Sequence, residues 1–285
     1  MIWTGVTASA EPETSDAQDT VAAINDVAGS VLDTAIDVSA TDSTVSTSAG
    51  VNVDLSTDAS DGISIDSPIA GDLAIGLPFA DVAGDAEVVD GVMVYDNGNG
   101  SSTTPLAHAD GSVQILTTIT GTSAPTEYTY VVDAASGGRL VLTEDGGVDV
   151  VGADGFVVSH VLAPWAVDAE GRSVPTRFSI NGDALTQTID HGVATAYPVV
   201  ADPKFTSTWW NKTLYFSKTE SAVVVAGGAT AAWIAHYFGL PGAVISGVLA
   251  AYASAFGIYT AAGKCGKLVW YVGYPAPVPQ PYWGS

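Results

Sequence analysis

Apolar and polar residues alternate through the middle of this chain, which is the pattern of strands that bury one face. Seven such stretches occur between residues 85 and 203, and turn-forming pairs that end in glycine separate them. Asn97-Gly98 and Asn181-Gly182 suit tight hairpin turns, because Asn and Gly both tolerate a positive φ. The number and spacing of these stretches predict an antiparallel β-sandwich or barrel-like domain over residues 85–203. The predicted strands are residues 87–95, 112–120, 127–132, 139–143, 155–162, 176–180 and 184–190.

The residues before this domain, 11–84, form an acidic segment of low complexity that is rich in Asp, Ser, Thr and Ala. Such a composition lies near the boundary of disorder. One helix is expected within the segment, because apolar residues recur at intervals of three and four residues, at Val21, Ile24, Ala28, Val31 and Ala35. After about residue 50 the apolar positions alternate instead, which indicates short strands or an extended linker.

The residues after the β domain, 204–285, carry a different pattern, which predicts two helices. No charged residue lies between Glu220 and Lys264. Ser217 and Glu220 match a capping box at the start of the first helix, and the sequence Gly-Leu-Pro at residues 239–241 suits the turn to the second helix. Flanking strands and an extended Pro-rich tail complete the segment, at residues 209–217, 267–272 and 274–285. The chain is therefore expected to have an α+β fold, in which the β-sandwich or barrel-like domain precedes a C-terminal hydrophobic helical hairpin.

The two predicted helices could be buried in protein or in lipid. Each has about 20 residues and is about 30 Å long, which matches the hydrocarbon core of a bilayer. Neither helix has a polar face, so the hairpin either packs against the β domain or enters a membrane with its lysines at the surface. Small residues at helix-packing intervals would allow close contact between the helices. The residues expected to contact a membrane or to pack within the hairpin are Trp233, Phe238, Leu240, Pro241, Gly242, Gly247 and Gly257.

The charge of the chain narrows the choice of partners. Its 285 residues include 31 acidic and 8 basic side chains, which gives a net charge of −23 at pH 7. This charge argues against nucleic acid as a partner, because phosphate binding requires a basic surface. Residues 204–285 hold five lysines against one glutamate, a balance of +4, and the other residues carry −27. Such asymmetry indicates two parts with different roles.

Residue types that carry catalysis or bind metals form no recognisable motif in this sequence. The chain has neither a Gly-x-Ser-x-Gly nucleophile elbow nor a phosphate-binding glycine loop. Its single cysteine, Cys265, can form no disulfide within the chain and cannot build a zinc site, and we expect it to be buried. Residues 96–100 resemble part of a calcium loop but lack the acid that closes one. We therefore expect no enzymatic activity, no cofactor and no metal.

The first residues, 1–10, resemble the end of a signal peptide. Ala8-Ser9-Ala10 fits the small-x-small pattern of a signal peptidase site, so cleavage would follow Ala10. A charged beginning and most of an apolar core are missing from these ten residues, and we expect them upstream. The alternative is an ordinary terminus rich in Ala and Ser. The signal-peptide interpretation predicts a secreted or cell-envelope protein.

A series of segments near the end of the β domain resembles a module of uncharacterised secreted proteins from Streptomyces and related actinobacteria. The segments are residues 163–172 (APWAVDAEGR), 174–176 (VPT), 182–187 (GDALTQ) and 197–203 (YPVVADP). In that family a strand, a helix start of the Lys-Thr-Glu type, a Gly/Ala-rich hairpin and an ending like residues 263–267 (GKCGK) follow the module, as they do here. This resemblance implies a secreted protein and no particular activity. The ending at residues 197–203 also resembles the close of β modules in large secreted repeat proteins, which implies a scaffold role.

Two functions fit these patterns. The first is an exported cell-envelope or extracellular protein with a structural or interaction role, whose hairpin meets a protein partner or membrane lipid. The alternative is a bacteriocin-like, membrane-active protein with an acidic N-terminal pro-region. In the alternative, the acidic part shields the cationic and apolar hairpin until a protease cuts the chain near Pro203.

Overall fold

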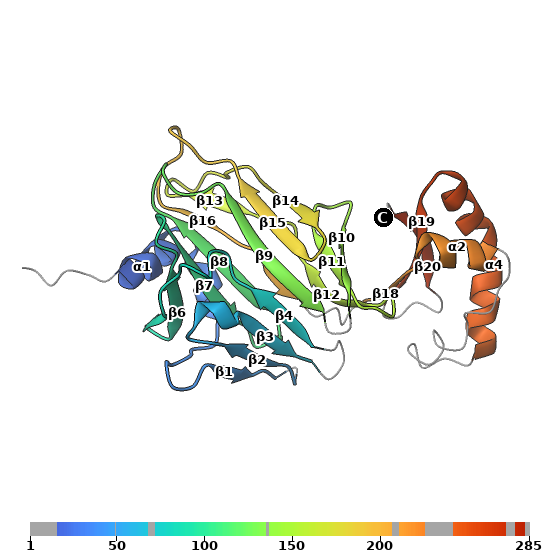
Figure 1. Cartoon of the computed structure of the whole chain (residues 1–285), viewed down its shortest axis with the longest axis horizontal. Helices are drawn as coiled ribbons and strands as arrows, with labels where there is room; N and C mark the ends of the chain where they lie inside the picture. The colour runs from blue at the N-terminus through green and yellow to red at the C-terminus, as the bar shows by residue number, and fades with distance from the viewer. Residues whose placement is uncertain are drawn as a thin grey trace, which may run out of the picture.

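The computed structural model describes residues 16–48, 50–67, 72–134, 137–206, 211–225, 242–271 and 277–282. Antiparallel β-sheets are the main secondary structure of the described chain and helices are few, so the fold is an α+β mixture. Two large sheets form the body of the molecule (Figure 1). A small third sheet and two helices form what we call the C-terminal module, which comprises the described residues between 211 and 282. The first helix lies at the end of the body opposite this module.

The first sheet has seven strands, and four of them come from the segment predicted to be of low complexity, residues 11–84. Strand β4 pairs with β9 along four residues, so the boundary predicted at residue 85 does not separate two folded units. β9 alternates between exposed and buried positions along its whole length, as expected for a strand with one face on a core. In spatial order the strands are β1 (Thr44–Ser46), β2 (Asn52–Leu55), β3 (Ile63–Asp66), β4 (Leu73–Gly76), β9 (Glu127–Ala134), β15 (Ala184–Ile189) and β14 (Thr176–Asn181).

The second sheet has ten strands, with β8 (Val113–Ile119) near its centre. β8 pairs with β7, β16 and β17. All seven residues of β8 and all seven of β7 are buried, so neither strand shows the alternation that marks a half-buried strand. The other strands are β5 (Glu87–Val89), β6 (Val92–Asp96), β7 (Ser101–Ala107), β10 (Arg139–Leu142), β11 (Val148–Val151), β12 (Val157–Val161), β13 (Ala166–Asp168), β16 (Val199–Ala201) and β17 (Lys204–Thr206).

One local prediction is wrong in this sheet. The single strand predicted over residues 87–95 is a hairpin of β5 and β6, joined by Asp90 and Gly91, which both have a positive φ. β16 has a proline on either side, yet it is an inner strand that pairs with both β13 and β8. Pro198 and Pro203 lie outside the strand, so they remove no N–H group from its two ladders.

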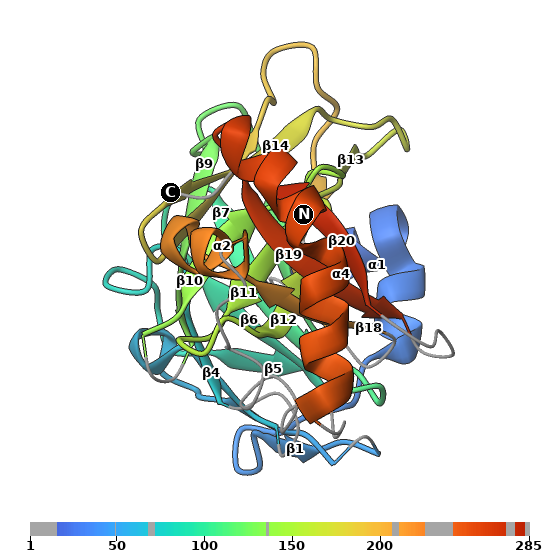
Figure 2. The ribbon, with the colours of Figure 1, turned by 90° about the vertical axis from the view of Figure 1, so that its right-hand side faces the viewer.

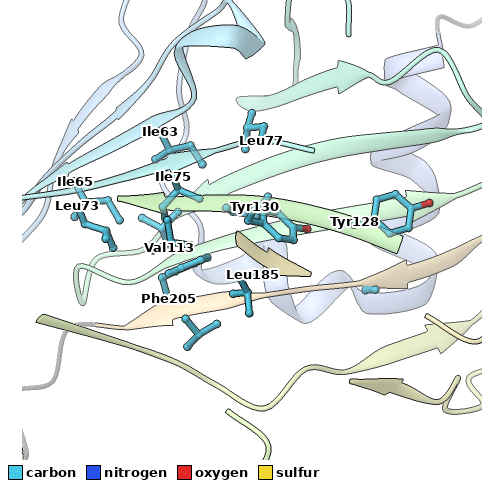
Figure 3. Close-up of a cluster of buried hydrophobic side chains, with 14 of the residues drawn as sticks. Ile63, Ile65, Leu73, Ile75, Leu77, Val113, Tyr128, Tyr130, Leu185 and Phe205 are labelled. Atoms are coloured by element: carbon cyan, nitrogen blue, oxygen red, sulfur yellow. The ribbon is translucent and has the colours of Figure 1, made fainter. Parts of the chain in front are cut away.

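The core of the body lies between the two large sheets, which contribute side chains to one buried cluster. Ile75 and Tyr130 enter it from the first sheet, and Val113 and Phe205 enter it from the second (Figure 3). The Tyr130 hydroxyl lies 3.3 Å from Thr117 Oγ1, so this buried polar group keeps a hydrogen bond inside the core. Burial of each large apolar side chain contributes about 1.5–3 kcal/mol, which makes this contact between sheets the main source of stability.

Helix α1 (Asp16–Ala28) covers the outer face of the second sheet, and a 3₁₀ helix, η1 (Gly29–Thr34), continues from it. α1 contains Val21, Ile24 and Ala28 of the spaced residues that predict a helix, whereas Val31 lies in η1 and Ala35 follows η1. Ile24 is fully buried in a cluster with Leu116 of β8, and Thr20 Oγ1 donates to Ser102 Oγ of β7 at 3.0 Å. Both faces of β8 are therefore covered, one by the core and the other by α1. A second 3₁₀ helix, η2 (Ala59–Asp61), lies between β2 and β3.

The C-terminal module packs helices α2 (Lys218–Val225) and α4 (Gly242–Ala261) on a sheet of β18 (Asn211–Tyr215), β19 (Cys265–Tyr271) and β20 (Val278–Tyr282) (Figure 2). The predicted capping box is confirmed. Ser217 N donates to Glu220 Oε2 at 2.8 Å, and Glu220 N donates to Ser217 Oγ at 3.2 Å. Residues 226–241, which include the predicted turn of the hairpin, lie outside the described residues. β17 belongs to the body, so the module begins after the boundary predicted at residue 204.

Asp202 is a carboxyl group buried next to the central strand of the second sheet, with an exposed fraction of 2%. Its Oδ1 accepts a hydrogen bond from Trp165 N, and its Oδ2 accepts one from Gln114 Nε2, both at 3.1 Å. Burial raises the pKa of Asp202 from 3.8 to about 7, although these hydrogen bonds act in the opposite direction. The folded chain therefore holds this proton more tightly than the unfolded chain does. As a result, the stability of the fold falls as the pH rises from about 4 to about 7.

We expect Asp202→Asn to remove this loss of folding stability at rising pH. The free energy of unfolding of the variant minus that of the wild type should grow by on the order of 4 kcal/mol between about pH 4 and pH 7, because one pKa unit corresponds to about 1.4 kcal/mol. Chemical denaturation at a series of pH values measures this difference. Asp183→Asn, at an exposed position in the β14–β15 turn, is the matched control and should show no such trend. If the difference in the free energy of unfolding between Asp202→Asn and the wild type is constant with pH, the raised pKa of Asp202 is contradicted.

Candidate functional site

The junction between the body and the C-terminal module is the candidate functional site. Backbone contacts join the two parts where the β11–β12 turn meets β18. Phe156 and Leu214 form an isolated β-bridge, and Tyr215 N donates to Gly155 O at 2.8 Å. Gly155 has a φ of 86°, and a Cβ atom placed there would lie 2.8 Å from Tyr215 O. Glycine is therefore required at this point, both for the turn and for the close approach of β18.

An apolar cluster fills one side of the junction. Phe156 of the body packs with Leu214, Phe216 and Phe256 of the module, and all four side chains are at most 3% exposed. The rings of Phe216 and Phe256 meet edge to face with centroids 5.2 Å apart, a favourable arrangement for aromatic pairs. Phe256 lies so close to Gly266 that a Cβ atom on this glycine would be 2.2 Å from Phe256 Cε1. The second glycine of the Gly-Lys-Cys-Gly-Lys ending thus allows α4 to rest on β19.

A second cluster joins β10–β12 of the body to the sheet of the module. Tyr215, Cys265 and Tyr282 are buried against three valines of the body, Val141, Val151 and Val157. The rings of Tyr215 and Tyr282 meet edge to face with centroids 4.6 Å apart, and Tyr282 OH donates to Phe216 O at 2.9 Å. Cys265 is fully buried, as its expected role as a small apolar residue requires.

A chain of polar groups crosses the junction beside these clusters. His160 Nδ1 lies 2.6 Å from Asp149 Oδ1, and Tyr215 OH donates to Asp149 Oδ2. Lys267 Nζ lies 3.5 Å from the Tyr215 oxygen and 5.3 Å from the centre of its ring. Asp149 and His160 belong to the body, whereas Tyr215 and Lys267 belong to the module. This polar chain therefore connects the two parts.

The electrostatics of the polar chain at the junction favour a structural role for its residues. Burial raises the pKa of Tyr215 far above 10, and the neighbouring Asp149 raises it further. The phenol therefore stays protonated and acts as a permanent donor to the carboxyl group. Among the described residues, no group of three His, Cys, Asp or Glu side chains could hold a metal ion. The arrangement holds two folded parts in a fixed orientation.

The structure describes only some of the residues that the sequence singles out. Ala10, Trp233, Phe238, Leu240 and Pro241 lie outside the described residues.

Three glycines of the predicted hairpin lie in α4. Gly242 is its first residue, and Gly247 lies one turn further along the helix. Gly257 faces α2, since a Cβ atom there would be 3.9 Å from Val225 Cγ1. No helix within the described part of the chain combines the length and apolar character needed to cross a bilayer.

The predicted processing position at Pro203 lies inside the body. Pro203 is buried, and its carbonyl oxygen accepts a hydrogen bond from Ile115 N at 2.8 Å. Asp202, the residue before it, is held by Trp165 and Gln114. A protease would reach this part of the chain only after β16 and β17 separate from β8.

Two of the segments that carry the family resemblance, residues 163–172 and 197–203, lie side by side, although 24 residues separate them in the sequence. β13 pairs with β16, which joins the APWAVDAEGR segment to the YPVVADP segment. Asp168 accepts hydrogen bonds from the backbone of Glu170, Arg172 and Ala196, and pairs with the Arg172 guanidinium at 2.8 Å. These contacts lower the pKa of Asp168 to about 2. The polar residues of the two segments thus stabilise the end of the body.

Sequence reasoning did not identify the polar chain at the junction. Asp149 carries a weak signal, because it interrupts an apolar run, VDVV, in which all four residues prove to be buried. Its partners His160 and Tyr215 lie 11 and 66 residues away, and no local pattern links them.

No family model matches the chain, and neither does a curated protein or a solved structure. The resemblance to secreted actinobacterial proteins therefore stays a prediction based on the segments themselves.

We expect Tyr215→Phe to destabilise the chain by about 1–3 kcal/mol, because the buried Asp149 carboxyl loses a donor at the junction. Tyr259→Phe is the matched control, since the Tyr259 hydroxyl lies in the same module and donates to a neutral acceptor, Pro279 O, at 3.2 Å. The free energy of unfolding of this control should fall by about 1 kcal/mol or less. Chemical denaturation followed by tryptophan fluorescence measures both values. Equal losses of the free energy of unfolding in the two variants would show that the hydrogen bond to Asp149 stabilises the fold no more than a bond to a neutral acceptor does.

Proposed function

We propose that this chain is an exported protein of the cell envelope or extracellular space, with a structural or interaction role. The observation that carries this proposal is the buried junction, in which Phe156 and Asp149 of the body fix the module through Leu214 and Tyr215. A part held rigidly at one end of a large scaffold presents the same surface at all times, which suits recognition of a partner. The net charge of −23 supports a partner other than nucleic acid.

The proposal includes two finer features of the fold. We take the body to be a β-sandwich, because both large sheets contribute to one core. We take the C-terminal helices to be the two arms of a hairpin, because α2 and α4 contact each other and both pack on the module sheet. Gly257 lies at this helix contact, where a small residue permits close approach.

The outer surface of the module supplies the proposed contact with a partner. Val223 and Val225 of α2 and Ile258 of α4 are exposed by 37%, 41% and 69%. Val225 lies next to Gly257, the residue before Ile258, and exposed apolar side chains that lie close together often mark an interaction site. We propose that this surface meets a protein partner or membrane lipid.

Mass spectrometry of the chain recovered from the culture medium and cell wall of its natural host tests both export and processing. We expect a mature chain that begins at Glu11 and remains intact across Pro203, because the buried strands β16 and β17 protect that peptide bond. Recovery of the chain in the cytoplasm with residues 1–10 attached would contradict export. A released fragment that begins near residue 204 would contradict the structural role and favour the membrane-active alternative.

A further inference from the structure

A groove with a volume of about 860 Å³ lies between α1 and the outer face of the second sheet. One side of α1, the β6–β7 turn, two positions at the end of β8, and the loop before β16 form its walls. Its size falls within the range of sites that hold small ligands, about 300–1,000 Å³. It lies at the end of the body opposite the C-terminal module, far from the junction (Figure 1).

Acidic side chains dominate the lining of this groove. Asp16, Asp19 and Asp26 project from α1, and their spacing of three and seven residues places them on one side of the helix. Asp96, at the end of β6, faces them from the sheet. Lys, Arg and His are absent from the described residues that line the groove. Carboxylates gathered in a concave surface concentrate a negative potential there, which attracts cations.

A buried hydroxyl group at the floor of the groove offers a hydrogen-bonding site for a ligand, and the surrounding carboxylates favour a ligand that donates. Thr118 pairs with Ser102 across β8 and β7, so its side chain lies on the face that α1 covers. Thr118 is 0% exposed and lines the groove, and its Oγ1 has no hydrogen-bond partner among the described residues. Ser102 beside it already accepts a hydrogen bond from Thr20. Because an unpaired buried hydroxyl costs free energy, a donor entering the groove would gain from meeting Thr118.

We propose that this groove binds an organic ammonium or guanidinium group, of the kind that lysine and arginine side chains carry. The cationic group would donate to Thr118 Oγ1 while the carboxylates of Asp16, Asp19 and Asp96 surround it. Tyr197 also lines the groove, and aromatic rings attract cations. The described residues contain no group of three acidic, histidine or cysteine side chains that could hold a metal ion, which favours an organic cation.

Calorimetric titration of the full chain with tetralysine at low ionic strength tests the proposal. We expect one binding site whose affinity falls as salt is added, since salt screens exposed charges. Thr118→Val and Asp96→Asn should each weaken binding about tenfold, because each removes a partner of a charged donor. Thr104→Val is the matched control for the hydroxyl, since Thr104 Oγ1 is also buried and without a partner among the described residues but lies outside the groove lining. Asp183→Asn is the control for charge, and both controls should bind as the wild type does.

Three outcomes would overturn the proposal. The first is the absence of binding, and the second is equal binding of tetra-alanine whose ends are acetylated and amidated, so that it carries no charge. The third is unchanged affinity in both Thr118→Val and Asp96→Asn. Replacement of an unpaired hydroxyl by a methyl group should preserve the fold, and far-UV circular dichroism checks this. If Thr118→Val does not fold, Asp96→Asn decides the test alone, because Asp96 is exposed at the end of its strand.

Discussion

The burial of β8 (Val113–Ile119) on both faces is the constraint on which the rest of the structure depends. Ile115 and Thr117 face the core between the sheets, whereas Leu116 and Thr118 face α1. Three strands pair with β8, so its edges are covered as well as its faces. A strand enclosed in this way tolerates little change in side-chain volume, because protein interiors are close-packed.

Both ends of the molecule are positioned by this strand. Thr118, near the end of β8, forms the floor of the acidic groove. At its other end, Val113 and Gln114 pair with β17, the last body strand before β18 and the module. The uneven charge of the chain follows the same division, because the acids gather on the body, whereas residues 211–282 hold four lysines and one glutamate. Groove and module can therefore act as separate surfaces on one rigid support.

The sequence predicts those elements whose signals are local. The capping box at Ser217 and Glu220 needs only neighbouring residues, and it is confirmed by two hydrogen bonds. The mainly antiparallel β architecture also follows from local alternation and glycine turns. β7 (Ser101–Ala107) could not be predicted in this way, because both its faces are buried and its sequence, SSTTPLA, lacks alternation.

The remaining features depend on contacts between distant residues. The pairing of β4 with β9 joins residues about 60 positions apart, and it converts a segment of disorder-like composition into part of a sheet. The polar chain from Asp149 to Tyr215 and the floor of the groove arise in the same manner. The composition of the sequence does not distinguish these residues from other acidic or neutral polar residues. They become neighbours only in the folded chain.

Native-state amide hydrogen exchange of the full chain tests the central place of β8 most directly. If β8 is enclosed on all sides, the amides of Ile115 and Leu116 should exchange only through global unfolding, and more slowly than those of the edge strand β1. The free energy of exchange at β8 should then equal the free energy of unfolding measured by denaturant. Exchange at β8 as fast as at β1 would contradict the account, because it would mean that this strand opens without the rest of the body.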